Sequence, residues 1–133
     1  MTDENLDPAL IELAHTLLDA ARQGDAETVR AFLDQGAPAD LRDAAGNSQL
    51  MLAAYHGHAA LVTELAARGA DVDLLSDRGQ SPLAGAAFKG FTDVAKALLA
   101  AGADPEAGEP NALATARYFA REEIVALIEA AQA

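Results

Sequence analysis

The sequence predicts an all-α solenoid of stacked helix pairs, and three observations support this prediction. Leucine and alanine recur with a period of 33 residues, as in the Ala53–Ala54 and Ala86–Ala87 pairs. Aromatic residues make up only 5% of the 133 residues, so aliphatic side chains and alanine have to build the core. One such unit cannot bury its own apolar face, so successive units have to stack. Glycines recur in phase with the alanines, in three series: Gly24, Gly57 and Gly90; Gly36, Gly69 and Gly102; Gly46 and Gly79.

The first element expected is a helix from Pro8 to about Arg22. Asp7 followed by Pro8 is a favourable N-cap and first helical position, because aspartate accepts a free backbone N–H and proline lacks one. We assign residues 1–7 to an N-terminal tail and helix cap. Residues 8–42 then form an N-terminal capping repeat with no turn before it.

Two full repeats are expected next, at residues 43–75 and 76–106 of a single domain that spans residues 1–133. In each, a glycine-containing turn, DAAG or SDRG, leads into a short helix with a small Ala-Ala face. Gly57 and Gly90 end these first helices, since glycine adopts the left-handed conformation found at helix C-termini.

The second helix of each unit follows directly. Its apolar residues have helical spacing, as in Val62, Leu65 and Ala66. Gly69 and Gly102 end the second helices and start the return to the next turn. The sequence therefore predicts helix–turn–helix units with alternating short connections.

Residues 107–133 are expected to form a C-terminal capping repeat. The spacing contracts to 30 residues there, as between Leu83 and Leu113. Arg117 and Glu129 stand where the inner repeats have alanine or leucine. Polar groups on the outer face of a terminal repeat keep the end of a stack soluble.

Charge and composition restrict the classes of partner. The net charge of −12 repels nucleic acid and anionic lipid, and favours a basic protein surface. The chain has no cysteine and no apolar stretch of membrane-spanning length. Its acidic start, MTDENLDPAL, lacks the basic region of a secretory signal. We expect a cytoplasmic monomer that binds neither nucleic acid nor membranes.

The candidate motifs for catalysis or metal binding each lack residues that their chemistry requires. GNSQL and GQSPL begin like a nucleophile elbow but lack its closing glycine and preceding strand. The aspartates of DVDLLSDRG resemble a calcium loop, yet Ser76 and Pro82 replace its required glycine and glutamate. His56 and His58 are too few for a metal site. We therefore expect no enzyme activity, no cofactor and no metal.

Two stretches, GNSQLMLAAYHGHAALVTELAARGADVD and GQSPLAGAAFKGFTDVAKALLAAGADPE, resemble ankyrin repeats. The resemblance extends from about residue 10 to the end of the chain and implies a small array of the bacterial type. The family's Thr-Pro-Leu-His turn is altered in both repeats, with Ser48 and Ser81 in the threonine position, where a hydroxyl caps the helix. Its histidine is absent, which predicts lower stiffness between repeats, while His58 takes the family's Gly-His position.

The resemblance also implies which residues line the concave face. The position after each Ala-Ala pair forms one column, made of Arg22, Tyr55, Phe88 and Tyr118. The next column contributes His56, Lys89 and Phe119. The turn tips add Arg42, Asn47, Leu75, Asp77, Arg78 and Gln80. Aromatic and basic side chains are typical interface anchors, although these rings alternatively pack between the first helices.

Two further features have alternative interpretations. Gly85 lies inside a predicted helix, where it either leaves a dent or lets two helices touch. Leu74 and Leu75 lie at a turn that is usually polar, and either tuck beneath the neighbouring turn or form an apolar contact point.

Two functions remain. The first is a non-enzymatic protein–protein interaction module that binds a protein or peptide on its concave face. The second is an acidic inhibitor or immunity protein that neutralises a basic enzyme, for which the net charge is suitable. An inhibitor is expected to concentrate its acidic groups on the binding face, whereas the columns named above are not especially acidic.

Overall fold

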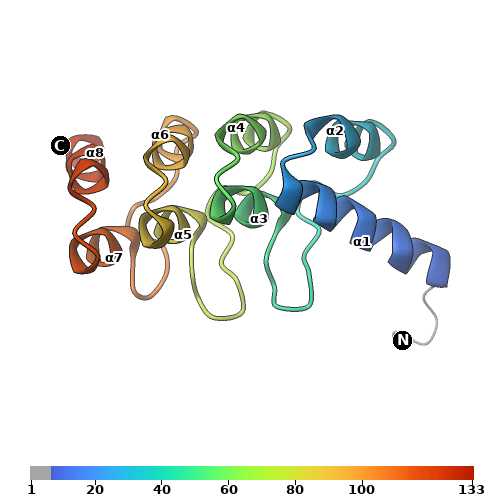
Figure 1. Ribbon diagram of the computed structural model, residues 1–133, viewed down its shortest axis with the longest axis horizontal. Helices are drawn as coiled ribbons and strands as arrows, with labels where there is room; N and C mark the ends of the chain where they lie inside the picture. The colour runs from blue at the N-terminus through green and yellow to red at the C-terminus, as the bar shows by residue number, and fades with distance from the viewer. Residues whose placement is uncertain (1–6) are drawn as a thin grey trace.

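The structure, a computed structural model, describes residues 7–133 as eight helices arranged in four consecutive pairs. The pairs stack side by side along the long axis of the molecule (Figure 1). The first helices of the pairs are α1 (Pro8–Gln23), α3 (Gln49–Tyr55), α5 (Pro82–Lys89) and α7 (Ala112–Tyr118). The second helices are α2 (Ala26–Asp34), α4 (Ala59–Ala67), α6 (Thr92–Ala100) and α8 (Glu122–Gln132).

This arrangement confirms the predicted all-α solenoid. First helices form one layer and second helices another, while the loops between pairs project beyond the first layer (Figure 1). Each helix pair lies within one of the four predicted units, although the unit boundaries themselves remain a prediction. Among residues 7–133, no helix is both long and apolar enough to cross a membrane.

Side-chain caps start every first helix. The Asp7 carboxylate accepts the Ala9 N–H, as the Asp-Pro pair predicted. The hydroxyls of Ser48 and Ser81 accept the backbone N–H three residues later, at 3.1 and 3.0 Å, in their predicted role. Asn111 does the same for α7, and each such cap contributes about 1 kcal/mol to helix stability.

The connection between the two helices of a unit also joins neighbouring units. Gly57 and Gly90 have φ of +85° and +78°, as predicted for the ends of α3 and α5. In two units, the N-cap residue of the second helix then reaches the preceding pair. His58 Nε2 forms a hydrogen bond with the Arg22 carbonyl at 2.8 Å, and Arg121 donates to the Phe88 carbonyl, also at 2.8 Å. These bonds give His58 the structural role that was expected.

The core runs without interruption through the stack. Leu50 and Leu83, at equivalent positions of α3 and α5, are 0% and 1% exposed. The alanine pairs beside them are fully buried, which lets the first helices approach closely. Gly85 lies at a close approach of α3 and α5, since a Cβ atom there would lie 3.0 Å from Met51 Cε. Gly85 thus lets α3 and α5 touch, the second of its two interpretations.

The two ends of the stack differ in polarity. At the C-terminal end, Arg117 and Glu129 are exposed and form an ion pair at 2.9 Å. At the other end, the side of α1 presents Leu10 and Leu13, which are 59% and 49% exposed. These leucines line an apolar groove of about 480 Å³ with Phe32 of α2. Arg117 and Glu129 are therefore exposed, as predicted, whereas their role as a cap remains a prediction.

We expect the double variant Arg117→Leu/Glu129→Leu to fold normally and to self-associate. An exposed ion pair contributes only about 0–1 kcal/mol to stability, whereas two leucines there would make this end of the stack apolar. Sedimentation velocity over a concentration series measures the association. Asp93→Leu/Lys96→Leu on the side of the stack is the matched control. A double variant no more associated than this control would contradict the assignment of the cap.

Candidate functional site

The loops between pairs are hairpin turns held in one row. The Asp43 N–H donates to the Asn47 carbonyl at 2.9 Å, and the Ser76 N–H donates to the Gln80 carbonyl at 3.0 Å. Neighbouring turns are joined through the backbone, since the Asp77 N–H donates to the Ala45 carbonyl at 3.0 Å. The row of turns projects beyond the layer of first helices (Figure 1).

A groove of about 360 Å³ lies between the first two turns and helix α3. Six predicted site residues line it: Arg22, Asn47, Tyr55, His56, Arg78 and Gln80. The sequence interpretation missed its other lining residues: Asp43, Ala45, Met51, Leu52 and Ser76. Two of them carried a signal, because Asp43 opens the DAAG turn and Met51 takes the position of the family's missing turn histidine.

Asp43 organises the rim of this groove. Its Oδ1 accepts the backbone N–H groups of Ala45 and Asn47, both at 2.9 Å. Its Oδ2 accepts a hydrogen bond from Arg22 Nη2 at 3.1 Å, and Arg22 also pairs with Asp19. Burial favours a higher pKa for Asp43, but the hydrogen bonds from Asn47, Ala45 and Arg22 outweigh burial and hold its pKa below the ordinary value. Arg22 therefore positions the turn, whatever it contributes to binding.

In the variant Asp43→Asn, the free energy of unfolding is expected to depend less on pH in the acidic range than in the wild type. A carboxylate whose pKa is lowered by folding stabilises the protein above its unfolded pKa, and this contribution is lost as the pH falls through the folded pKa. The free energy of unfolding of the wild type should thus fall more steeply below about pH 5 than that of the variant. Urea melts at a series of pH values measure both slopes. Parallel profiles would show that Asp43 is not stabilised as described.

The predicted aromatic columns form one continuous row, which we call the aromatic row: Tyr55, Phe88, Phe119 and Tyr118. Tyr55 and Phe88 stack with centroids 6.1 Å apart and an interplanar angle of 12°. Phe88 meets Phe119 edge to face at 5.1 Å, and Tyr118 meets Phe119 at 4.9 Å. The aromatic row thus begins with Tyr55 and Phe88 of the first predicted column, passes to Phe119 of the second column, and ends at Tyr118 of the first.

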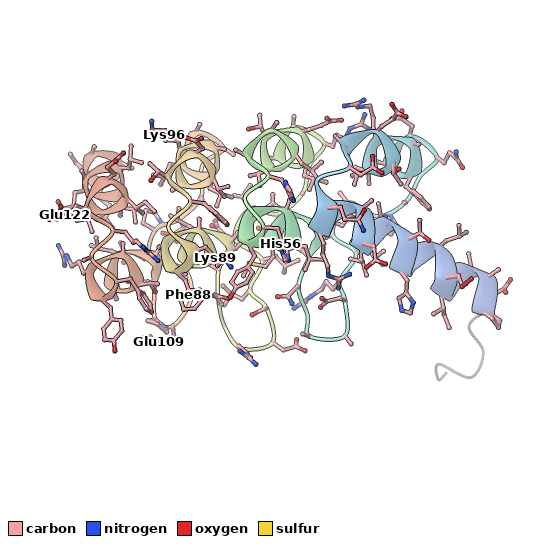
Figure 2. All side chains as sticks on the ribbon, in the orientation of Figure 1. His56, Phe88, Lys89, Lys96, Glu109 and Glu122 are labelled. Atoms are coloured by element: carbon pink, nitrogen blue, oxygen red, sulfur yellow. The ribbon has the colours of Figure 1, made fainter. Side chains whose placement is uncertain are left out.

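The aromatic row is packed and exposed at the same time. Phe88 and Phe119 are each 39% exposed, and Tyr118 is 83% exposed. Figure 2 shows Phe88 and Lys89 between the first helices and the turns, whereas Lys96 lies at the opposite edge, on the second helices. The two interpretations of the rings, interface and packing, therefore both have a geometric basis.

Basic groups lie beside the aromatic row. Lys89 Nζ is 5.1 Å from the centroid of the Tyr55 ring, within the range of a cation–π interaction. His56 contacts the same ring edge to face at 5.9 Å. Burial lowers the pKa of His56, and the nearby His58, Lys89 and Arg22 lower it further. His56 is therefore neutral at pH 7, in a locally positive field.

Three predicted turn residues lie outside the groove lining and contact one another. Arg42 donates to the Gly46 carbonyl at 3.0 Å and to the Leu75 carbonyl at 2.9 Å, and lies 3.8 Å from the Asp77 carboxylate. The half-buried Leu75 side chain packs near Gly108 of the next turn, as expected if it tucks beneath that turn. These contacts hold the turns together, and a role in binding for Arg42, Leu75 and Asp77 remains a prediction.

Comparison with known proteins places these features in context. A family model described as ankyrin repeats in three copies matches residues 17–109. A protein of Pseudomonas aeruginosa whose name describes it as an ankyrin repeat protein is 46% identical over 56 residues, or 40% of this chain. The match covers 33% of that protein, so the chain spans about a third of the length of this relative.

Proposed function

The chain belongs to the ankyrin-repeat family, and from this premise we propose that it is a non-enzymatic module that binds a protein or peptide in its concave groove. Ankyrin repeats are generally protein–protein interaction modules. The groove between the turns and α3 provides a concave surface, and the aromatic row continues this surface across α5 and α7.

The exposed aromatic row is the observation that supports this proposal most strongly. Large apolar side chains gathered at one surface mark interaction sites more often than singly exposed ones do. Tyrosine and phenylalanine supply contact area with few rotatable bonds, and rings that already pack on one another lose little freedom on binding. A partner covering Phe88 and Tyr118 therefore gains apolar burial at a low entropic cost.

The alternative, an acidic inhibitor of a basic enzyme, lacks this kind of support. Such a protein is expected to gather carboxylates on its binding face. Asp43 is the one acidic residue among the eleven that line the groove, and Arg22 and two backbone N–H groups already occupy it. The acidic excess of the chain therefore lies elsewhere on its surface.

Affinity capture with matched baits tests the proposed function. The wild type, Tyr55→Ala/Phe88→Ala and Phe32→Ala serve as baits in extract of the native cell, followed by mass spectrometry. Phe32 is a half-buried ring of α2, away from the groove. We expect proteins that both the wild type and Phe32→Ala retain and that the double variant loses. Retention of the same proteins by all three baits would place binding elsewhere.

A further inference from the structure

The charge of the groove is opposite to that of the chain as a whole. The chain has 21 acidic and 9 basic residues, yet the groove lining contains Arg22 and Arg78 against the single carboxylate of Asp43. Lys89 adds a positive charge at the edge of the groove, over Tyr55. A concave basic surface on an acidic protein attracts negatively charged groups locally while the remaining surface repels them.

Two basic residues at the groove, Arg78 and Lys89, form no ion pair within the described part of the chain, whereas Arg22 in the same groove is paired with Asp43 and Asp19. Arg30 and Arg68 on the second helices and Arg117 at the C-terminal end each form ion pairs with carboxylates. Among residues 7–133, no carboxylate lies within 4.0 Å of Arg78 or Lys89. The nearest exposed acid in sequence, Asp77, lies beside Arg42 at 3.8 Å.

The direction in which the pKa of His56 is shifted agrees with this distribution of charge. His56 lines the groove, and each charged group that shifts its pKa is basic: His58, Lys89 and Arg22. These groups lower the pKa of His56 in addition to its burial. The positive charges on α1 and α5 thus act on the same point beside Tyr55.

We propose that the groove binds an acidic peptide segment that places a carboxylate beside an apolar side chain. The carboxylate contacts Lys89 and Arg78, and the apolar side chain packs on the stacked rings of Tyr55 and Phe88. This inference rests on the proposed function, since it specifies the partner of the same groove. Charge complementarity at such a rim steers association and selects against basic partners.

Selection from a phage-displayed library of random peptides on the immobilised full chain tests this inference. The most enriched peptide is then synthesised and titrated by fluorescence anisotropy at low and high ionic strength. We expect it to be acidic, to contain apolar residues, and to bind more weakly at high salt, because salt screens exposed charges.

Charge-reversal variants identify the basic groups that bind the carboxylate of the peptide. Lys89→Glu and Arg78→Glu should each weaken binding of the enriched peptide by about tenfold or more, because like charges then face each other. Lys96→Glu on the second helices is the matched control and should leave affinity within about twofold, since it changes the net charge equally but far from the groove. Lys89→Arg should retain binding. Circular dichroism verifies that each variant is folded.

The outcomes separate this inference from the proposed function. Enriched peptides that are basic or neutral, but that lose binding in Phe88→Ala, would overturn the acidic partner and leave a protein-binding groove. An acidic peptide equally weakened by Lys89→Glu and Lys96→Glu would also overturn it, because only net charge would then matter. Peptides whose affinity is unchanged in Phe88→Ala would count against the groove as a binding site and against both proposals. A selection that enriches no peptide would do the same.

Discussion

Replacement of Leu83 by alanine is expected to lower the free energy of unfolding by about 2–5 kcal/mol. Leu83 is 1% exposed and lies on α5, which packs against α3, α6 and α7. The buried alanine pairs around it are already close-packed, so the cavity left behind closes only in part. Urea denaturation followed by circular dichroism measures the loss.

Leu113→Ala is the matched control for this variant. Leu113 follows the cap Asn111 by two residues, as Leu83 follows Ser81, but it is half-buried in the terminal unit. Its truncation should therefore cost less than that of Leu83. Equal losses, or a loss of less than about 1 kcal/mol for Leu83→Ala, would contradict a core that runs through the centre of the stack.

Phe88→Ala is expected to weaken binding of the enriched peptide by at least about 2 kcal/mol, or about 30-fold. Phe88 stacks on Tyr55 and meets Phe119, so its loss removes the centre of the aromatic row. Because 39% of Phe88 is exposed, its truncation should cost less stability than the roughly 3–5 kcal/mol of a fully buried phenylalanine. A binding titration and a urea melt on the same preparation give both numbers.

Phe32→Ala is the control for this experiment. Phe32 belongs to α2 and lines the apolar groove at the other end of the molecule. Its truncation should lower stability and leave peptide affinity unchanged. The opposite pattern for Phe88→Ala, a large loss of stability with unchanged affinity of the folded fraction, would show that the rings serve packing alone.

The helices could be predicted from the sequence because their determinants are local. The Asp7–Pro8 pair fixes the start of α1, and Ser48 and Ser81 start α3 and α5 through bonds that span three residues. Alanines and leucines that recur with the 33-residue period mark buried positions, because equivalent residues of successive units pack against equivalent neighbours. Period and capping together therefore predict the layers of the solenoid and its order of elements.

The sequence indicates which residues share the face of the groove, but it does not indicate which of them contact one another. The pairing of Arg22 with Asp43 joins residues 21 positions apart, and depends on how the first turn folds back toward α1. The crossing of the aromatic row at Phe119 depends on the contact between Phe88 and Phe119, which belong to neighbouring helix pairs. A repeat pattern specifies which residues share a face, whereas their mutual distances follow from the three-dimensional stacking of the units.

Mapping by nuclear magnetic resonance tests most directly the central claim that the concave groove is the binding surface. Backbone amide spectra of the isotope-labelled chain are recorded as the enriched peptide is added. We expect the largest shift changes at Tyr55, His56, Phe88 and Lys89 and in the two turns that border the groove. Changes confined to α4 and α6, or to the apolar groove beside Leu10, would contradict the account.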